Sequence, residues 1–396
     1  MISAIRRSYR HTVLACYTGY ITQAIINNFA PLLFLTFASD FSLSLEHITM
    51  IPTLNFAVQL LVDLLAARMV DRIGYRPCIV AAHVFAAVGM AALAILPHMM
   101  APFAGILIAV VLYAIGGGLI EVLISPIVEA CPSDDKAGAM SLLHSFYCWG
   151  QVGLIALSTA FFAAFGMRAW PVLSCLWALV PLCNTGYFMF VPIGSIVPEG
   201  QHAQSIGELM RQKVFWLLAL MMLCAGASEL AISQWASAFV ESALGLTKAM
   251  GDLLGPCVFG VLMGTARAIY GKNSDKLPLR QVMMGCAVLC MGCYLIAVLA
   301  ESPMLALAGC AVCGFSVGIF WPGTFSTATG ALPGGGTAMF ALMALAGDMG
   351  CSAGPTVVGL VSGAVGGSLK AGLLAAIVFP LGMLLFAGLV NEKRKG

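Results

Sequence analysis

Three carboxylates of this sequence lie deep inside long apolar segments: Glu121, Glu229 and Asp348. Only 17 Asp and Glu occur among the 396 residues, and most of the others lie in polar stretches or near the ends of apolar runs. A carboxyl group removed from water holds its proton more tightly, and it releases the proton when water or a cation reaches it. We therefore interpret these three residues as proton-coupling groups. The alternative is a neutral acid that only joins neighbouring helices.

Uncharged polar side chains also recur at helical spacing in the apolar segments. Gln23 and Asn27 are four residues apart and share a helical face, with Asn28 beside them. These three amides are too many for contact with lipid, so we expect them to face a cavity or one another. No Lys or Arg is expected at the middle of a span, so we expect the three acids to lack a permanent counter-charge.

A second polar face follows from His144, Tyr147 and Gln151, at positions i, i+3 and i+7 of one segment. Imidazole, phenol and amide groups in fixed directions suit the hydroxyl groups of a sugar, and an aromatic ring can stack on the apolar face of its pyranose. Trp149, Trp235 and Trp321 are candidates for that ring. For Trp170 and Trp216, near the ends of segments, we expect the membrane interface.

The composition identifies the elements that must position these residues. Hydrophobic residues make up 61% of the chain and charged residues 9%, against roughly 25% charged in soluble proteins. This predicts an all-α integral membrane protein, and the net charge of +2 without a basic tract excludes nucleic-acid binding. A span needs about 20 apolar residues. Twelve segments qualify: 13–37, 48–69, 78–97, 101–130, 138–165, 169–192, 213–241, 249–270, 281–300, 303–330, 336–364 and 369–390. Pro31, Pro322 and Pro355 are expected to interrupt three of them.

The basic residues predict the orientation. In a model of twelve alternating spans, all of the 19 Lys and Arg except Arg168, Lys248 and Lys370 fall on one side. By the positive-inside rule that side is the cytoplasm. We therefore expect a multi-pass protein of the plasma membrane, a bacterial inner membrane, with both termini cytoplasmic.

A polar stretch divides the chain into two halves of six spans each. It predicts an N-terminal six-helix bundle over 1–193, a cytoplasmic linker over 194–212 and a C-terminal six-helix bundle over 213–396. Asp71-Arg-Ile-Gly-Tyr-Arg76 follows span 2, and Asp275-Lys-Leu-Pro-Leu-Arg280 follows span 8 at the same internal spacing. This echo indicates two pseudo-symmetric halves with a solute site between them near the midplane.

The loop after span 2 carries a family signature. Ala67-x-x-x-Asp71-Arg72-x-Gly74-x-Arg76 resembles the loop between helices 2 and 3 of the major facilitator superfamily. The resemblance implies a secondary transporter that alternates between inward- and outward-open states. An acidic residue beside two arginines at helix ends can form charge-assisted bonds that such a motion must break. We expect Asp71, Arg72, Arg76 and Asp275 to act in gating.

A narrower resemblance is to the fucose permease-like sugar transporters of that superfamily. It rests on four patches: Ala24-x-x-Asn27-Asn28, Gly117-Gly118-Leu-Ile-Glu121-Val-x-x-x-Pro126, His144-Ser-Phe146-Tyr147-x-Trp149-Gly150 and Ser228-Glu229-Leu-Ala-Ile-Ser-Gln234-Trp235. The resemblance implies proton-coupled uptake of a sugar. It also implies that the sugar pathway is lined by Asn27, Asn28, Glu121, His144, Tyr147, Glu229, Gln234 and Trp235.

Other functions receive less support from the sequence. No G-x-x-x-x-G-K-[ST] motif for ATP is present, so the driving force is an ion gradient or that of the solute itself. Export of drug-like or amphipathic compounds by proton antiport remains an alternative, and a non-transporting sensor is a weaker one. The six scattered His favour neither an enzyme nor a metal site. Cys290-x-x-Cys293 and Cys310-x-x-Cys313 lie in apolar segments and are expected to pack there. We expect no cofactor, and partners limited to a small solute, a proton and the lipid bilayer around a monomer.

Overall fold

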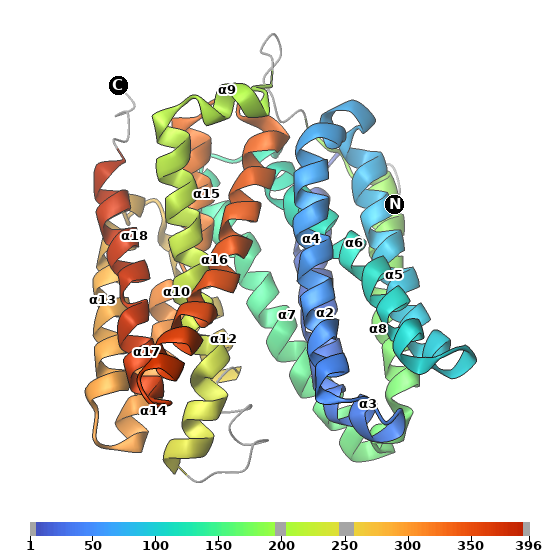
Figure 1. The fold of residues 1–396 in the computed structure, drawn as a ribbon. Helices are drawn as coiled ribbons and strands as arrows, with labels where there is room; N and C mark the ends of the chain where they lie inside the picture. The colour runs from blue at the N-terminus through green and yellow to red at the C-terminus, as the bar shows by residue number, and fades with distance from the viewer. Residues whose placement is uncertain (1–4, 195–202, 245–256, 391–396) are drawn as a thin grey trace. The chain divides into compact units, whose positions relative to one another are not determined.

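The chain is helical throughout the residues that its computed structural model describes, which are 5–194, 203–244 and 257–390 (Figure 1). These ranges contain no strand, and ten stretches of helix within them are long and apolar enough to cross a membrane. Two further helices, α2 (Tyr9–Leu32) and α12 (Val258–Asn273), lie where the sequence predicts spans 1 and 8. The all-α membrane architecture is therefore confirmed.

The helices form two compact units that do not follow the chain order strictly. Unit 1 comprises Met1–Pro132, Phe146–Gln201 and Gly336–Ala341; unit 2 comprises Ser133–Ser145, His202–Gly335 and Leu342–Gly396. Two helices are shared between the units. The first turns of α7 (Lys136–Phe165) belong to unit 2 and the rest to unit 1, whereas α16 (Gly336–Ala364) begins in unit 1 and continues in unit 2.

Unit 1 is held together by close packing of helix backbones. Besides α2 and parts of α7 and α16 it contains α3 (Phe34–Asp40), α4 (Leu45–Ile73), α5 (Tyr75–Met99), α6 (Pro102–Ala130), the short 3₁₀ helix η1 (Met167–Ala169) and α8 (Trp170–Phe190). A Cβ atom at Gly89 of α5 would lie 2.3 Å from the backbone nitrogen of Tyr113 in α6. The absent side chain lets the two helices touch, which is how small residues join membrane helices.

Unit 2 is also held together by close packing of helix backbones. Besides parts of α7 and α16 and the helix α12, it contains α9 (Ile206–Met210), α10 (Lys213–Leu244), α13 (Leu279–Leu299), α14 (Pro303–Val317), α15 (Phe320–Ala331), α17 (Leu369–Ala376) and α18 (Val378–Leu389). A Cβ atom at Gly350 of α16 would lie 2.0 Å from the carbonyl oxygen of Leu223 in α10. The absent side chain of Gly350 therefore lets α10 and α16 pack in direct contact.

The prolines act differently from one another. The predicted span 303–330 is two helices, because α14 ends at Val317 and α15 begins at Phe320. Pro322 has no amide hydrogen, so the carbonyl of Gly318, four residues earlier, loses its helical donor. In α2, Pro31 lies one residue before the end of the helix. The expectation for Pro355 is wrong, since α16 continues through it to Ala364.

Trp170 also departs from the expectation. The sequence places it at a membrane interface, but only 1% of it is exposed. Its ring packs against Phe37 at a centroid distance of 5.3 Å and against His98 at 5.7 Å. Trp216 is half exposed, and its indole N–H donates to the carbonyl of Met210 at 2.8 Å. Of the two tryptophans, Trp170 is therefore enclosed by other rings, and only Trp216 is exposed.

Candidate functional site

A chain of polar side chains crosses three helices of unit 1, and Gln23 of α2 is its centre. The Nε2 atom of Gln23 donates to Oε2 of Glu121 in α6 and to Oε1 of Gln59 in α4, each at 3.1 Å. Both hydrogens of one amide group are thus used, one on the half-buried carboxylate of Glu121 and one on a second amide. The structure thus brings together Gln23 and Glu121, two residues that the sequence analysis assigns to solute binding.

The chain continues from Gln59 to Asn27. Nε2 of Gln59 donates to Oδ1 of Asn27 at 2.8 Å, and Nδ2 of Asn55 donates to the same oxygen at 3.2 Å. Gln59 and Asn55 are 1% and 4% exposed, so both lie inside unit 1. The sequence interpretation missed these two residues. Their spacing of four in an apolar segment is the same signal that identified Gln23 and Asn27.

Two acceptors of this network have no hydrogen-bond partner among the described residues. They are Oε1 of Gln23 and Oδ1 of Asn55, both buried. An unsatisfied buried acceptor costs about 1–3 kcal/mol, so such atoms are normally bonded. Hydroxyl or N–H groups of a solute, or water, are the chemical groups that would satisfy them.

Gly117 of α6 allows these amides their positions. A Cβ atom there would lie 3.2 Å from Oε1 of Gln23 and 3.3 Å from Cδ of Gln59. These distances are shorter than ordinary carbon contacts, so a side chain at this position would displace both amides. The glycine is therefore part of the site's geometry as well as of the helix packing.

The remaining predicted polar residues of unit 1 have other surroundings. The Nδ2 atom of Asn28 donates to the carbonyl of Ala24 in its own helix at 2.9 Å. Tyr147 and Gln151 are half-buried on α7. Trp149 is 38% exposed. Asn28 thus differs from Asn27, although the two are adjacent in the sequence.

Unit 2 contains an ion pair that contradicts one expectation. Glu229 of α10 was expected to lack a permanent counter-charge, but Nη2 of Arg267 lies 3.4 Å from its Oε2 atom. Arg267 is only 3% exposed. It falls inside the predicted span 249–270, and sorting the charges by side counted it with the residues that meet water. That count overlooked a buried guanidinium.

The other bonds of Arg267 explain how its charge is held in this position. Its Nε atom donates to the carbonyl of Gly318 at 2.8 Å, and Nη1 donates to the carbonyl of His144 at 3.2 Å. The Gly318 carbonyl is the one that Pro322 leaves without a helical donor. A guanidinium has five N–H donors in a rigid plane, which suits it to several acceptors at once.

His144, Trp321 and Asp348 also lie in unit 2. The imidazole of His144 is 4% exposed and lies 5.8 Å from the ring of Phe325, which meets the ring of Trp321 at 6.5 Å. Trp321 packs on the backbone of α16, because a Cβ atom at Gly347 would lie 2.3 Å from its Cη2 atom. Asp348 is the next residue of α16 and is half-buried. The side chains of Gln234 and Trp235 lie outside the described residues.

The predicted gating residues differ in the contacts that they make. Oδ1 of Asp71, at the end of α4, accepts from the hydroxyl of Thr337, and that hydroxyl also bonds to the hydroxyl of Tyr75. Thr337 is fully buried at the start of α16, within unit 1. Arg72 and Asp275 are exposed. Asp71 is therefore the residue of this group that reaches α16.

Arg76 and Arg280 instead bind the ends of helices. Arg76 donates to the carbonyls of Phe188, Met189 and Val191 at 2.8, 3.0 and 2.9 Å, at the end of α8. In unit 2, Arg280 donates to the carbonyl of Ala387 at 3.1 Å and to that of Gly388, at the end of α18.

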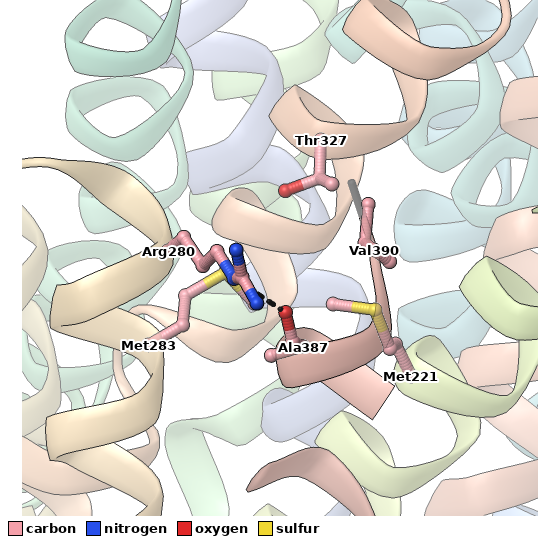
Figure 2. A pocket seen from close by; sticks show the side chains of 6 residues that line it. All are labelled: Met221, Arg280, Met283, Thr327, Ala387 and Val390. Carbon is pink, nitrogen blue, oxygen red and sulfur yellow. Dashed lines mark hydrogen bonds between the residues drawn. The ribbon is translucent and has the colours of Figure 1, made fainter. Parts of the chain in front are cut away.

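Figure 2 shows the side chain of Arg280 at a small hollow within unit 2. The dashed line there is its bond to Ala387. The hollow is lined by Met221, Arg280, Met283, Thr327, Ala387 and Val390. Since the Arg280 guanidinium is already bonded to helix carbonyls, the hollow adds no free cation to the site.

The sequence profile of the Major Facilitator Superfamily matches residues 15–355. No curated protein sequence matches the chain. Solved structures do match it in fold. The transporter FucP in its outward conformation has 15% identity and a TM-score of 0.82, with 96% of this chain and 99% of that chain covered.

Two further structures have the same fold. The proton:xylose symporter XylE has 14% identity and a TM-score of 0.79, with 98% of this chain and 95% of that chain covered. The human organic anion transporter MFSD10 has 16% identity and a TM-score of 0.75, with 97% and 100% covered. At these identities the likeness establishes the fold alone.

Proposed function

This chain belongs to the Major Facilitator Superfamily, and on that basis we propose that it is a secondary transporter that carries a sugar together with a proton. The hydrogen-bond chain of unit 1 carries the proposal. It combines amide donors and acceptors with one half-buried carboxylate, and it leaves two buried acceptors for groups of a solute. Sugar hydroxyls supply such groups. The shared fold with symporters of fucose and xylose supports the same substrate class.

Each residue has a proposed role. Glu121, Glu229 and Asp348 bind the proton. The residues assigned to solute binding from the sequence are Gln23, Asn27, Asn28, Glu121, His144, Tyr147, Gln151, Glu229, Gln234, Trp235 and Trp321, to which we add Asn55 and Gln59. Glu121 belongs to both groups because its Oε2 atom accepts from Gln23, which links the proton site directly to the amides.

Transport would proceed by alternating access of the halves 1–193 and 213–396, joined by the linker 194–212. We propose that a bacterial inner membrane contains the monomer, with both termini in the cytoplasm. Gating is assigned to Asp71, Arg72, Arg76 and Asp275. The bond from Thr337 to Asp71 supports this role for Asp71, because it joins residues from the two halves and would break when they separate.

Uptake into proteoliposomes tests the function. We expect a monosaccharide to accumulate faster under an imposed pH gradient, and we expect Glu121→Gln to abolish this acceleration while exchange of solute across the membrane continues. Glu208→Gln is the matched control, since Glu208 is an exposed carboxylate in the short helix α9. Uptake that does not depend on the pH gradient and is unchanged in Glu121→Gln would refute proton coupling. Preferential movement of amphipathic compounds over sugars would support the exporter instead.

A further inference from the structure

We propose that the solute is an amino sugar, and that the hydrogen-bond chain of unit 1 receives its protonated amino group. The inference rests on the proposed function, because it narrows the class of sugar that is carried. Three observations support it: two buried acceptors of the chain that lack partners, the acids beside them, and the positions of the basic residues of unit 1.

The hydrogen-bond chain has two layers between α2 and α4. Gln23 bonds to Gln59 in the first layer, and Asn27 accepts from Asn55 in the second. The numbers rise by four in α2 while they fall by four in α4, so the layers are about 6 Å apart along both helices. Each layer contains one buried acceptor without a hydrogen-bond partner in the described part of the chain. These acceptors are Oε1 of Gln23 and Oδ1 of Asn55.

The orientation of both amides shows that the groups left over are oxygens. Nε2 of Gln23 meets two acceptors, on Glu121 and Gln59, and a flipped amide would place its oxygen against both. A flipped Asn55 would likewise place its oxygen against Oδ1 of Asn27. An amide oxygen needs a donor, which hydroxyl and ammonium groups supply and which carboxylates cannot.

Two acids lie beside these acceptors. Oε2 of Glu121 accepts from the same amide group that carries Oε1 of Gln23. Asp63 follows Gln59 by four residues on α4, so it shares the helical face of Gln59, and it is fully buried. With two carboxylates in this part of unit 1, one can hold the coupling proton while the other balances the charge of a cationic solute.

The basic side chains of unit 1 lie away from the middle of its described helices. All of its Lys and Arg are in loops, in η1 or within two turns of a helix end: Arg6, Arg7, Arg10, Arg68, Arg72, Arg76 and Arg168. The buried His83 of α5 is neutral, because its Nδ1 atom donates to the carbonyl of Ile79 at 2.8 Å and its Nε2 atom accepts from Asn184 at 2.9 Å. A cationic solute at the chain would therefore meet acids and acceptors of unit 1 without repulsion from a basic side chain at the same depth.

An amino sugar fits these features better than a neutral sugar. A protonated amino group has three N–H donors and no acceptor, whereas a hydroxyl also brings lone pairs that need donors. The ammonium would donate to Oε1 of Gln23 beside Glu121, and a hydroxyl of the same ring would donate to Oδ1 of Asn55. Asn27 and Glu121 are half-buried, so the chain reaches the surface of unit 1 at these two residues.

Titration calorimetry of the purified full-length protein tests the inference, in a slightly acidic buffer that keeps the amines protonated. The probes are D-glucosamine, D-galactosamine and D-mannosamine, each compared with its parent hexose and with its uncharged N-acetyl derivative. We expect at least one amino sugar to bind with a Kd roughly tenfold lower than both matched probes, because charge-assisted hydrogen bonds are about twice as strong as neutral ones.

Two variants locate the amino group. Glu121→Gln should remove most of the preference for the amino sugar over its parent hexose. Asn55→Leu should weaken the binding of both probes by a similar factor and keep the preference. Glu208→Gln changes an exposed carboxylate of α9 and should leave every Kd unchanged. Each preference is a ratio of two Kd values for one protein, so a general loss of packing does not imitate the expected pattern.

The outcomes overturn distinct statements. Equal or tighter binding of the parent hexoses, or no binding of any amino sugar, would overturn the inference. A preference that persists in Glu121→Gln would overturn its placement in unit 1. Preferred binding of an amino sugar without its transport into proteoliposomes would refute the proposed function alone. Proton-driven uptake of a neutral hexose without any preference for amino sugars would refute only the inference.

Discussion

Arg76 and Arg280 make the same interaction in the two units: each binds the final carbonyl groups of a helix that ends at Phe190 or Leu389. A guanidinium at a helix C-terminus satisfies carbonyls that have no intrahelical donor and interacts favourably with the helix dipole. The echo between the sequence following span 2 and that following span 8 thus corresponds to one shared structural device. In both cases the arginine stabilises a unit internally.

We expect Arg76→Gln and Arg280→Gln each to lower stability. Loss of charge-assisted bonds to helix carbonyls costs about 1.5–3 kcal/mol. Thermal unfolding in detergent measures the change as a lower midpoint. Arg72→Gln is the matched control, because Arg72 is an exposed arginine in the last turn of α4, four residues before Arg76. An equal decrease in Arg72→Gln would show that the loss reflects net charge and not the helix ends.

Gln59→Leu should weaken solute binding more than it weakens the fold. The substitution removes the amide that links Gln23 to Asn27, and it leaves Oδ1 of Asn27 with one donor fewer. We expect the KM for uptake to rise roughly tenfold, the equivalent of one hydrogen bond of about 1.4 kcal/mol. Thr22→Val is the control, since the buried Thr22 hydroxyl donates only to Thr18 of its own helix among the described contacts. Similar KM values in both variants would contradict a binding role.

Gly117→Ala should impair transport through the positions of two amides. The added methyl group would lie 3.2 Å from Oε1 of Gln23, so the amide that donates to Glu121 must shift by a few tenths of an ångström. We expect a clear loss of proton-driven uptake at nearly unchanged expression. Gly153→Ala makes the same change on α7 where no atom lies within 4 Å. If both variants transport alike, the close contact at Gly117 has no functional consequence.

The short helix α9 should respond to acid. Its N-terminus has a capping box, in which the backbone N–H and hydroxyl of Ser205 donate to Oε2 of Glu208 at 2.7 and 2.8 Å. These bonds hold the pKa of Glu208 below its ordinary value. A depressed pKa means that the cap stabilises the helix above the ordinary Glu value of about 4.3 and loses this effect as the pH falls through the native pKa.

Exchange of peptides covering 203–212 measures that effect. After correction for intrinsic rates, protection should be full near neutral pH and should decrease in acid. Ser205→Ala removes the hydroxyl and should reduce protection already at neutral pH. Protection that is independent of pH and of Ser205 would contradict a role of this cap in ordering α9.

Several residues of the unit 1 site were predictable because the signal, a polar residue in an apolar helix, depends only on nearby sequence. Gln23, Asn27 and Glu121 stand out as polar residues in apolar helices, and a shared helical face follows from spacing alone. Asn55 and Gln59 carry the same signal, a spacing of four in an apolar segment, and the sequence analysis did not include them. Which amide donates to which oxygen depends on how three helices pack, and spacing along one helix does not contain that information.

The unit 2 site was less predictable because its decisive partner is backbone. Arg267 resembles a loop cation by sequence, yet it is buried and bonded to two carbonyl oxygens. Carbonyls are present at every position and become acceptors only where a helix is interrupted or approached closely. The same limitation explains Trp170, whose burial depends on the rings that surround it.

The break before Pro322 has an evolutionary consequence. Because Pro322 has no amide hydrogen, the carbonyl of Gly318 needs another donor. Arg267, more than fifty positions earlier in the chain, supplies it. The two residues should therefore be inherited together. Relatives with an amide-bearing residue at the position of Pro322 would provide the Gly318 carbonyl with its own helical donor. In those relatives we expect other side chains to replace the arginine at position 267.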